Sequence, residues 1–148
     1  KRRICKNLLI LLSNAWAYHG LACLYLKSDP EKAKQFIMEG MALQRERLSY
    51  QKEGFKILEK CGAYKEIDEE YKKQTAENQK NGRIQYYYVA ALAKLERNEE
   101  AYHLLNDGDG IDVSDIREGD SDIQSIWESF TKKCTGKKGI CRTTIILK

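Results

Sequence analysis

Proline is almost missing from this sequence: Pro30 is the single example among 148 residues, beside ten glycines. Lys, Glu, Leu and Ala are abundant instead, and this composition favours helix. The hydrophobic content of 42% and the mean hydropathy of −0.64 are those of a soluble globular chain rather than a disordered one. The length fits one domain that is large enough to bury a core.

Several signatures of site chemistry are also lacking. The five cysteines form no CxxC pair, and neither His19 nor His103 has a companion at metal-ligand spacing. No glycine-rich phosphate loop occurs, and no serine or cysteine stands beside a histidine as a nucleophile. We therefore expect no cofactor, no metal site and no catalysis. The odd number of scattered cysteines predicts a reducing, cytoplasmic compartment.

Long apolar runs are missing too, so the sequence predicts no membrane span. Residues 1–17 have the order of a secretory signal, which is the alternative to a cytoplasmic chain, but the apolar run Leu8–Leu12 is short for one. The net charge of +4 is unevenly spread: residues 1–6 carry +4, residues 131–148 carry +6, and residues 7–130 carry −6. No compact basic stripe with interleaved aromatic residues accompanies these ends, so we expect solvated tails and no nucleic-acid binding.

The chain is organised around one fixed interval, the step from Trp16 to Tyr50, which we call the repeat interval. Five apolar columns keep this step over three copies: Trp16, Tyr50 and Ile84; Leu21, Phe55 and Val89; Leu24, Leu58 and Leu92; Ala33, Ile67 and Ala101; Ile37, Tyr71 and Leu105. A period of about 34 residues is typical of units of two antiparallel helices that bury their apolar faces by stacking on neighbours. The sequence therefore predicts an all-α fold, a helical-repeat solenoid of about three helix pairs.

Turn signals place the helices within this period. Asp29 can cap a helix that begins at Pro30, where the missing N–H costs nothing. Gly62 suits a left-handed helix cap, and Gly82 marks another turn. The predicted helices cover residues 4–27, 30–44, 48–60, 64–78, 84–95 and 98–106.

The segment after the helix pairs begins with an acidic turn. Asp107, Asp109 and Glu118 have the spacing of a calcium loop, but Asp112 stands where that loop requires glycine, so a plain turn is expected. Residues 111–116 are predicted to pack as an extended cover over the last helix pair. A capping helix from Ser121 to about Lys133 is expected to close the open end.

These signals divide the chain into four parts. Residues 1–13 form a basic and apolar N-terminal extension of the first helix, and residues 14–108 hold the three repeats. Residues 109–134 form the loop and capping helix, and residues 135–148 a basic tail expected to be poorly ordered.

The repeats resemble the tetratricopeptide repeat (TPR) family over residues 14 to about 108. Trp16-x-x-His19-Gly20 and Ala33-x-x-x-Ile37 resemble its W-x-x-L-G and A-x-x-x-F cues. The resemblance implies that the first helix of each pair lines a concave groove. Six side chains are then implied to face that groove: Tyr18, Tyr25, Lys52, Lys56, Arg83 and Tyr86.

The implied function is a non-catalytic scaffold that binds a protein, a peptide segment or another domain of the parent protein. The tyrosines would offer flat contact area, and the cations would attract an acidic partner. Tyrosines also fill spaces between helices, which is the alternative. Chaperone-binding members use Lys and Asn where this chain has Tyr18 and Ala22, which argues against a chaperone C-terminus as the ligand.

A narrower resemblance involves Gly82–Ile84, Ala101–Leu105 and Asp115–Gly119, followed by Ile123 and Trp127. This pattern is similar to the C-terminal TPR section of large bacterial proteins with an N-terminal β-sandwich domain of unknown function, of a carbohydrate-associated type. It implies an alternative function, a helical accessory module of a larger carbohydrate-active enzyme.

Overall fold

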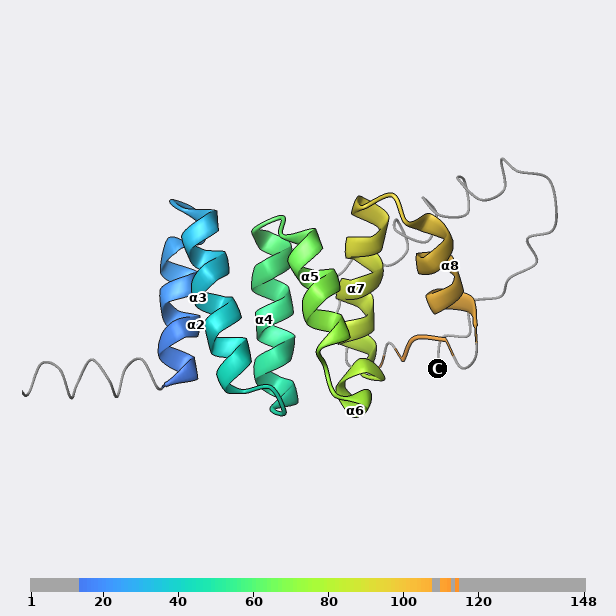
Figure 1. Cartoon of the computed structure of the whole chain (residues 1–148), viewed down its shortest axis with the longest axis horizontal. Helices are drawn as coiled ribbons and strands as arrows, with labels where there is room; N and C mark the ends of the chain where they lie inside the picture. The colour runs from blue at the N-terminus through green and yellow to red at the C-terminus, as the bar shows by residue number, and fades with distance from the viewer. Residues whose placement is uncertain (1–13, 108–109, 113, 115–148) are drawn as a thin grey trace, which may run out of the picture. The chain divides into compact units, whose positions relative to one another are not determined.

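The computed structural model describes residues 14–107, 110–112 and 114, and all regular structure in this part of the chain is helical. The helices are α2 (Ala15–Tyr25), α3 (Pro30–Leu43), α4 (Leu48–Lys60), α5 (Tyr64–Lys72), α6 (Ala76–Gln79), α7 (Gly82–Lys94) and α8 (Asn98–Asn106) (Figure 1). The predicted all-α class is confirmed for these residues. The chain divides into two compact units between Glu66 and Ile67, inside α5, and each unit is described by itself.

The repeat interval recurs in the helix bounds. Helix α4 runs from residue 48 to 60, and α7 runs from 82 to 94. Helix α5 runs from residue 64 to 72, and α8 from 98 to 106, while α3 starts one repeat interval before α5. The predicted bounds of α4 and α8 are confirmed.

The turns after α4 and α7 repeat at the same interval. Gly62 ends the first turn with φ +69°, and Glu96 ends the second with φ +61°. In both turns the next amide closes back on the helix: Ala63 N–H donates to Leu58 C=O at 3.0 Å, and Arg97 N–H to Leu92 C=O at 2.9 Å. The left-handed cap predicted at Gly62 is confirmed.

Polar side chains fix where three helices begin. Asp29 accepts from Lys32 N–H at 3.1 Å, which confirms the predicted cap before Pro30. Asn81 accepts from Arg83 N–H at 3.1 Å, so α7 begins two residues before the predicted start. Asn14 is extended and accepts from Trp16 N–H at 3.0 Å. A single helix over residues 4–27 is therefore wrong, because the chain enters α2 through a cap.

The first unit is built on α2, α3 and α4. Helices α2 and α3 lie side by side in opposite directions, and α4 packs on both (Figure 1). Tyr50, Phe55 and Leu58 of α4 are fully buried. Tyr50 donates to Ala15 C=O, and burial raises the pKa of its hydroxyl to about 12. Gly40 leaves the space for this ring, because a Cβ there would lie 1.9 Å from the Tyr50 hydroxyl oxygen.

The core of the second unit lies between α7 and α8. It consists of a buried cluster: Tyr88, Val89, Leu92, Ala101 and Ile111. The predicted cover over the last helix pair is confirmed at Ile111, which is buried in that cluster. The backbone beside it approaches α7 so closely that a Cβ at Gly82 would lie 1.5 Å from Asp112 O.

The predicted helix over residues 64–78 is wrong, because it is broken between Lys72 and Ala76. Thr75 adopts an extended backbone and its hydroxyl accepts from Asn78 N–H at 3.2 Å, which starts α6 as a separate helix. Across the break, the Gln79 amide donates to Tyr71 C=O at 2.9 Å, and the Tyr71 hydroxyl donates to Gln79 C=O at 3.2 Å. These side-chain bonds compete with continued helix.

Four predictions lie outside the described residues, wholly or in part. They are the extension over 1–13, the calcium-loop comparison beyond Asp112, the capping helix at 121–133 and the tail at 135–148. Within the described ranges, no helix combines the length and the apolar character needed to cross a bilayer.

Candidate binding surfaces

The six side chains implied to face a groove come from three helices. Tyr18 and Tyr25 lie on α2, and Lys52 and Lys56 lie on α4, all in the first unit. Arg83 and Tyr86 lie on α7 in the second unit. Each group is therefore considered within its own unit.

Two of the six side chains are enclosed. Tyr18 is 7% exposed and its ring lies 6.3 Å from the ring of Phe36. Burial raises the pKa of its hydroxyl, and so does the hydrogen bond to Glu39. Tyr86 is 6% exposed and meets Tyr87 edge-on at 5.4 Å. Both tyrosines therefore fit the alternative in which tyrosines fill spaces between helices, since little of either ring faces solvent.

Tyr25 is half-buried and already has two partners. Its ring stacks on Phe36 at 5.8 Å, with an angle of 29° between the ring planes. The ammonium group of Lys32 lies 4.3 Å from the Tyr25 ring centroid. Such a contact contributes about 0.5–1 kcal/mol at an exposed site, so it stabilises the joint between α2 and α3.

The three predicted cations keep part of their surface in water. Lys52 and Lys56 are half-buried and lie one turn apart on α4, where they face the same side of the helix. Arg83 is half-buried in the first turn of α7. Each of the three takes part in interactions within the protein, so a partner would have to add to or replace these.

The first copy of the repeat exposes three columns that the other copies bury. Trp16, Leu21 and Leu24 of α2 are 44%, 37% and 71% exposed, whereas their counterparts on α4 and α7 are at most 1% exposed. We refer to these three side chains as the α2 face. The three columns are therefore open in the first copy and buried in the other two.

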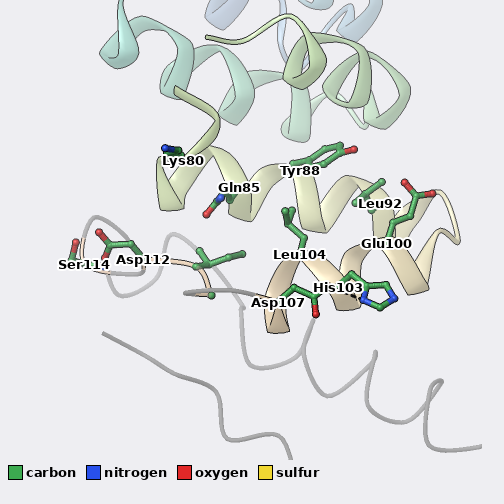
Figure 2. Close-up of a pocket in the computed structure, with 12 residues that line it drawn as sticks. Lys80, Gln85, Tyr88, Leu92, Glu100, His103, Leu104, Asp107, Asp112 and Ser114 are labelled. Carbon is green, nitrogen blue, oxygen red and sulfur yellow. Dashed lines mark hydrogen bonds and ion pairs between the residues drawn. The ribbon is translucent and has the colours of Figure 1, made fainter. Parts of the chain in front are cut away.

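A hollow lies in the second unit between α7, α8 and residues 110–112 and 114 (Figure 2). Its volume is about 1030 Å³, and Figure 2 shows Leu104 pointing from α8 toward α7. The lining combines apolar, acidic and basic groups: Lys80, Gln85, Tyr88, Leu92, Glu100, His103, Leu104, Asp107, Gly110, Ile111, Asp112 and Ser114. The sequence did not predict this hollow. The sequence feature that could have indicated it is Gly82, whose missing side chain lets the backbone of Asp112 approach α7.

Two pairs of polar groups lie among the residues that line the hollow. The His103 Nδ1 atom lies 3.0 Å from an Asp107 carboxylate oxygen, and both side chains are exposed. At the other end, the Ser114 N–H donates to Asp112 at 2.9 Å, which lowers the pKa of that carboxyl. The lining thus combines apolar side chains with charges of both signs, a composition that suits polypeptide contact.

A network of ion pairs links α5 to the start of α8 in the second unit. Asp68 on α5 accepts from Lys72 at 2.9 Å and from Arg97 at 3.0 Å. Arg97 also donates to Glu100 at 2.7 Å. Burial alone would raise the pKa of Asp68, but the hydrogen bonds from Lys72 and Arg97 lower it. Burial beside Asp68 raises the pKa of Tyr88 to about 12.

The described residues gather no three His, Cys, Asp or Glu side chains that could hold a metal ion. Comparisons with protein families, curated proteins and solved structures find no match for this chain. Any statement about function therefore rests on its own residues.

Proposed function

We propose that this chain is a non-catalytic, TPR-like helical-repeat module that binds a protein segment or another domain of its parent protein. The observation that carries the proposal is the recurrence of helix bounds and helix-ending turns at the repeat interval. Proteins built from such units offer extended surfaces made by many side chains, which suit polypeptide partners.

The chemistry of the partner follows from the cations that keep part of their surface in water. Residues 7–130 carry a net charge of −6, so Lys52 and Lys56 form a positive site on an acidic body. An acidic segment would be attracted to this pair, and its attachment would weaken with salt. Arg83 offers a further cation in the second unit.

The test uses the full chain and a fluorescent peptide of alternating glutamate and phenylalanine as the probe. Anisotropy should rise on binding at low salt and fall again at high salt. The variant Lys52→Glu/Lys56→Glu should lose most of this binding, because both changes reverse charge on the proposed surface. Tyr18 and Tyr86 are poor choices for substitution, since their burial would confuse lost binding with lost folding.

Lys60 and Lys65 supply a matched control, because both are exposed lysines near α4 and their reversal changes the net charge equally. The Lys60→Glu/Lys65→Glu variant should keep the binding. Equal binding by both double variants would contradict the assignment of this surface.

A further inference from the structure

Helices α2 and α4 bring a thiol, an imidazole and a carboxylate together in the first unit. Cys23 and His19 lie one turn apart on α2, so they share one side of that helix. The Cys23 Sγ atom lies 3.9 Å from His19 Nδ1 and 4.0 Å from His19 Nε2. The expectation that no cysteine stands beside a histidine is therefore wrong for this pair, because one turn of helix brings the two side chains together.

The imidazole also reaches a carboxylate on the neighbouring helix. The His19 Nε2 atom lies 3.8 Å from a carboxylate oxygen of Glu53 on α4. A nucleophile, a base beside it and a third group that orients the base form the common arrangement for activating a thiol. We refer to Cys23, His19 and Glu53 as the thiol cluster.

Two aromatic rings hold the imidazole in place. The His19 ring meets Trp16 edge-on at 5.4 Å between ring centroids, and it meets Tyr50 edge-on at 6.4 Å. Tyr50 is fully buried and donates to Ala15 C=O, so the position of its ring is fixed. These contacts restrict the rotamers of His19 and keep its ring beside the thiol.

Access to the thiol separates Cys23 from Cys61, the other cysteine among the described residues. Cys23 is exposed, whereas Cys61 is half-buried after the end of α4, and burial raises the pKa of the Cys61 thiol. Reactive thiols are accessible and have a group nearby that favours the thiolate, whereas buried structural thiols are inert. Cys23 meets both conditions, and Cys61 is a control within the same chain.

The surroundings of Cys23 favour an uncharged reagent. Helix α2 contains no Asp, Glu, Lys or Arg, and its exposed side chains include Trp16 and Leu24. A Cβ at Gly20 would meet no atom within 4 Å, so the surface one turn before Leu24 is open. The carboxylate of Glu53 would repel an anion that approaches the thiol.

We propose that Cys23 is a modification site that exchanges with small uncharged disulfides, with His19 as its base. His19 accepts the proton of the Cys23 thiol, and the carboxylate of Glu53 stabilises the imidazolium that results. The Cys23 sulfur then attacks one sulfur of the reagent, the S–S bond of the reagent breaks, and the leaving thiolate takes the proton from His19. Cys23 is oxidised to a mixed disulfide, and the reagent is reduced to one released thiol. This single modification needs no turnover, so it is compatible with a non-catalytic module.

The test follows each cysteine of the full chain during reaction with dithiodipyridine, an uncharged disulfide. Acid stops the reaction, and mass spectrometry after trypsin digestion reads each site, since cleavage places Cys23 in residues 7–27 and Cys61 in residues 61–65. Cys23 should react at least about tenfold faster in the native chain than in the chain unfolded in urea, because a positioned base contributes at least this much. Cys61 should react more slowly in the native chain than in the unfolded one.

Substitutions identify the base. His19→Gln should slow the reaction of Cys23 by at least about tenfold, and Glu53→Gln should slow it several-fold. The matched control is His103→Gln, which makes the same change in the second unit and should leave the rate unchanged. Circular dichroism checks that each variant keeps its helix content. If His19→Gln loses helix, Glu53→Gln decides the role of the cluster, because its carboxylate is partly exposed.

An anionic reagent tests the preference for uncharged disulfides. The rate of dithiobis(nitrobenzoate) with Cys23 should rise less on folding than the rate of dithiodipyridine does, and an equal rise would overturn this preference. The whole proposal is overturned if Cys23 reacts no faster in the native chain than in the unfolded one. It is also overturned if the folded His19→Gln and Glu53→Gln variants keep the parent rate.

Discussion

Two ion-pair sites, one between the first and second copies of the repeat and one between the second and third, solve the same electrostatic problem with opposite charges. At the first site, Lys34 of α3 donates to Glu66 of α5 at 3.1 Å. The residues one repeat interval later are Asp68 and Glu100, two acids that would repel each other. Arg97, which stands where the second copy has Ala63, donates to both of these acids. A reversed charge in one position is thus matched by a cation in another.

The comparison shows that an ion pair recurs at equivalent positions of the repeat, although different residues form it. The two ion-pair sites should also differ in how much stability is lost when their cation is substituted. At the first site a lysine with a flexible stem lies between Glu31 and Glu66, whereas at the second a planar guanidinium lies between Asp68 and Glu100. Equivalent positions in two copies should therefore respond differently to the same change.

The largest effect is expected in the column of Leu24 and Leu58. Leu58→Asp should unfold the first unit, because it removes a fully buried side chain and buries an unpaired charge, at a cost of more than about 4 kcal/mol. Leu24→Asp, the same change in the first copy, should cost less than about 1 kcal/mol, since that side chain is 71% exposed. Urea unfolding followed by circular dichroism measures both. Similar losses would show that the two copies do not differ in burial.

A smaller effect is expected from the ion pairs. Arg97→Ala should lower the Tm more than Lys34→Ala does, because its partners Asp68 and Glu100 are less exposed than Glu66 and Glu31, the partners of Lys34. Asp68→Lys/Arg97→Ala gives the second ion-pair site the charges of the first, with a lysine facing Glu100. This double variant should recover part of the Tm lost by Arg97→Ala alone. A further fall in Tm would show that the two copies are not equivalent at these positions.

The same network sets a pH dependence with a definite sign. The pKa of Asp68 is lower in the folded state than its ordinary value, so the unfolded state takes up protons first as the pH falls. The stabilisation is present above the ordinary pKa and is lost as the pH falls through the folded pKa. The Tm of the parent should therefore decline in acid, and Arg97→Ala should reduce the part of this decline that belongs to Asp68.

The sequence predicts the elements that depend on local chemistry. The bounds of α4 and α8 and the cap at Asp29 follow from periodicity and turn residues. The break after Lys72 does not, because no glycine or proline marks it, yet Thr75 caps α6 there. Local propensity describes which residues form helix well, but a side-chain cap can outweigh it.

The candidate surfaces are less predictable because they depend on what covers each face. The columns show that α2 has an apolar side, yet they do not show that Trp16 and Leu24 lie open. Likewise, the spacing that places Tyr18 and Tyr86 on one side of their helices does not show that both are enclosed. The charge reversal from Lys34 to Asp68 is visible at the repeat interval, but the sequence analysis did not use it to predict the role of Arg97.

The smallest effect concerns the turns after α4 and α7, where Gly62 and Glu96 adopt the same left-handed backbone. With this left-handed backbone, a residue that has a Cβ lowers the free energy of unfolding by roughly 1–2 kcal/mol. Glycine avoids this loss, but its greater freedom in the unfolded chain lowers the free energy of unfolding by about 0.5–1 kcal/mol. Glu96→Gly should therefore raise the free energy of unfolding by about 0.5–1 kcal/mol, and Gly62→Glu should lower it by a similar amount. A Cβ at position 62 would meet no atom within 4 Å, so the backbone alone sets that cost. Gly62→Ala should then match Gly62→Glu, and Glu96→Ala should leave stability unchanged. If Glu96→Ala proves as costly as Gly62→Glu, a contact of the glutamate side chain stabilises the turn, and its backbone conformation is not the cause.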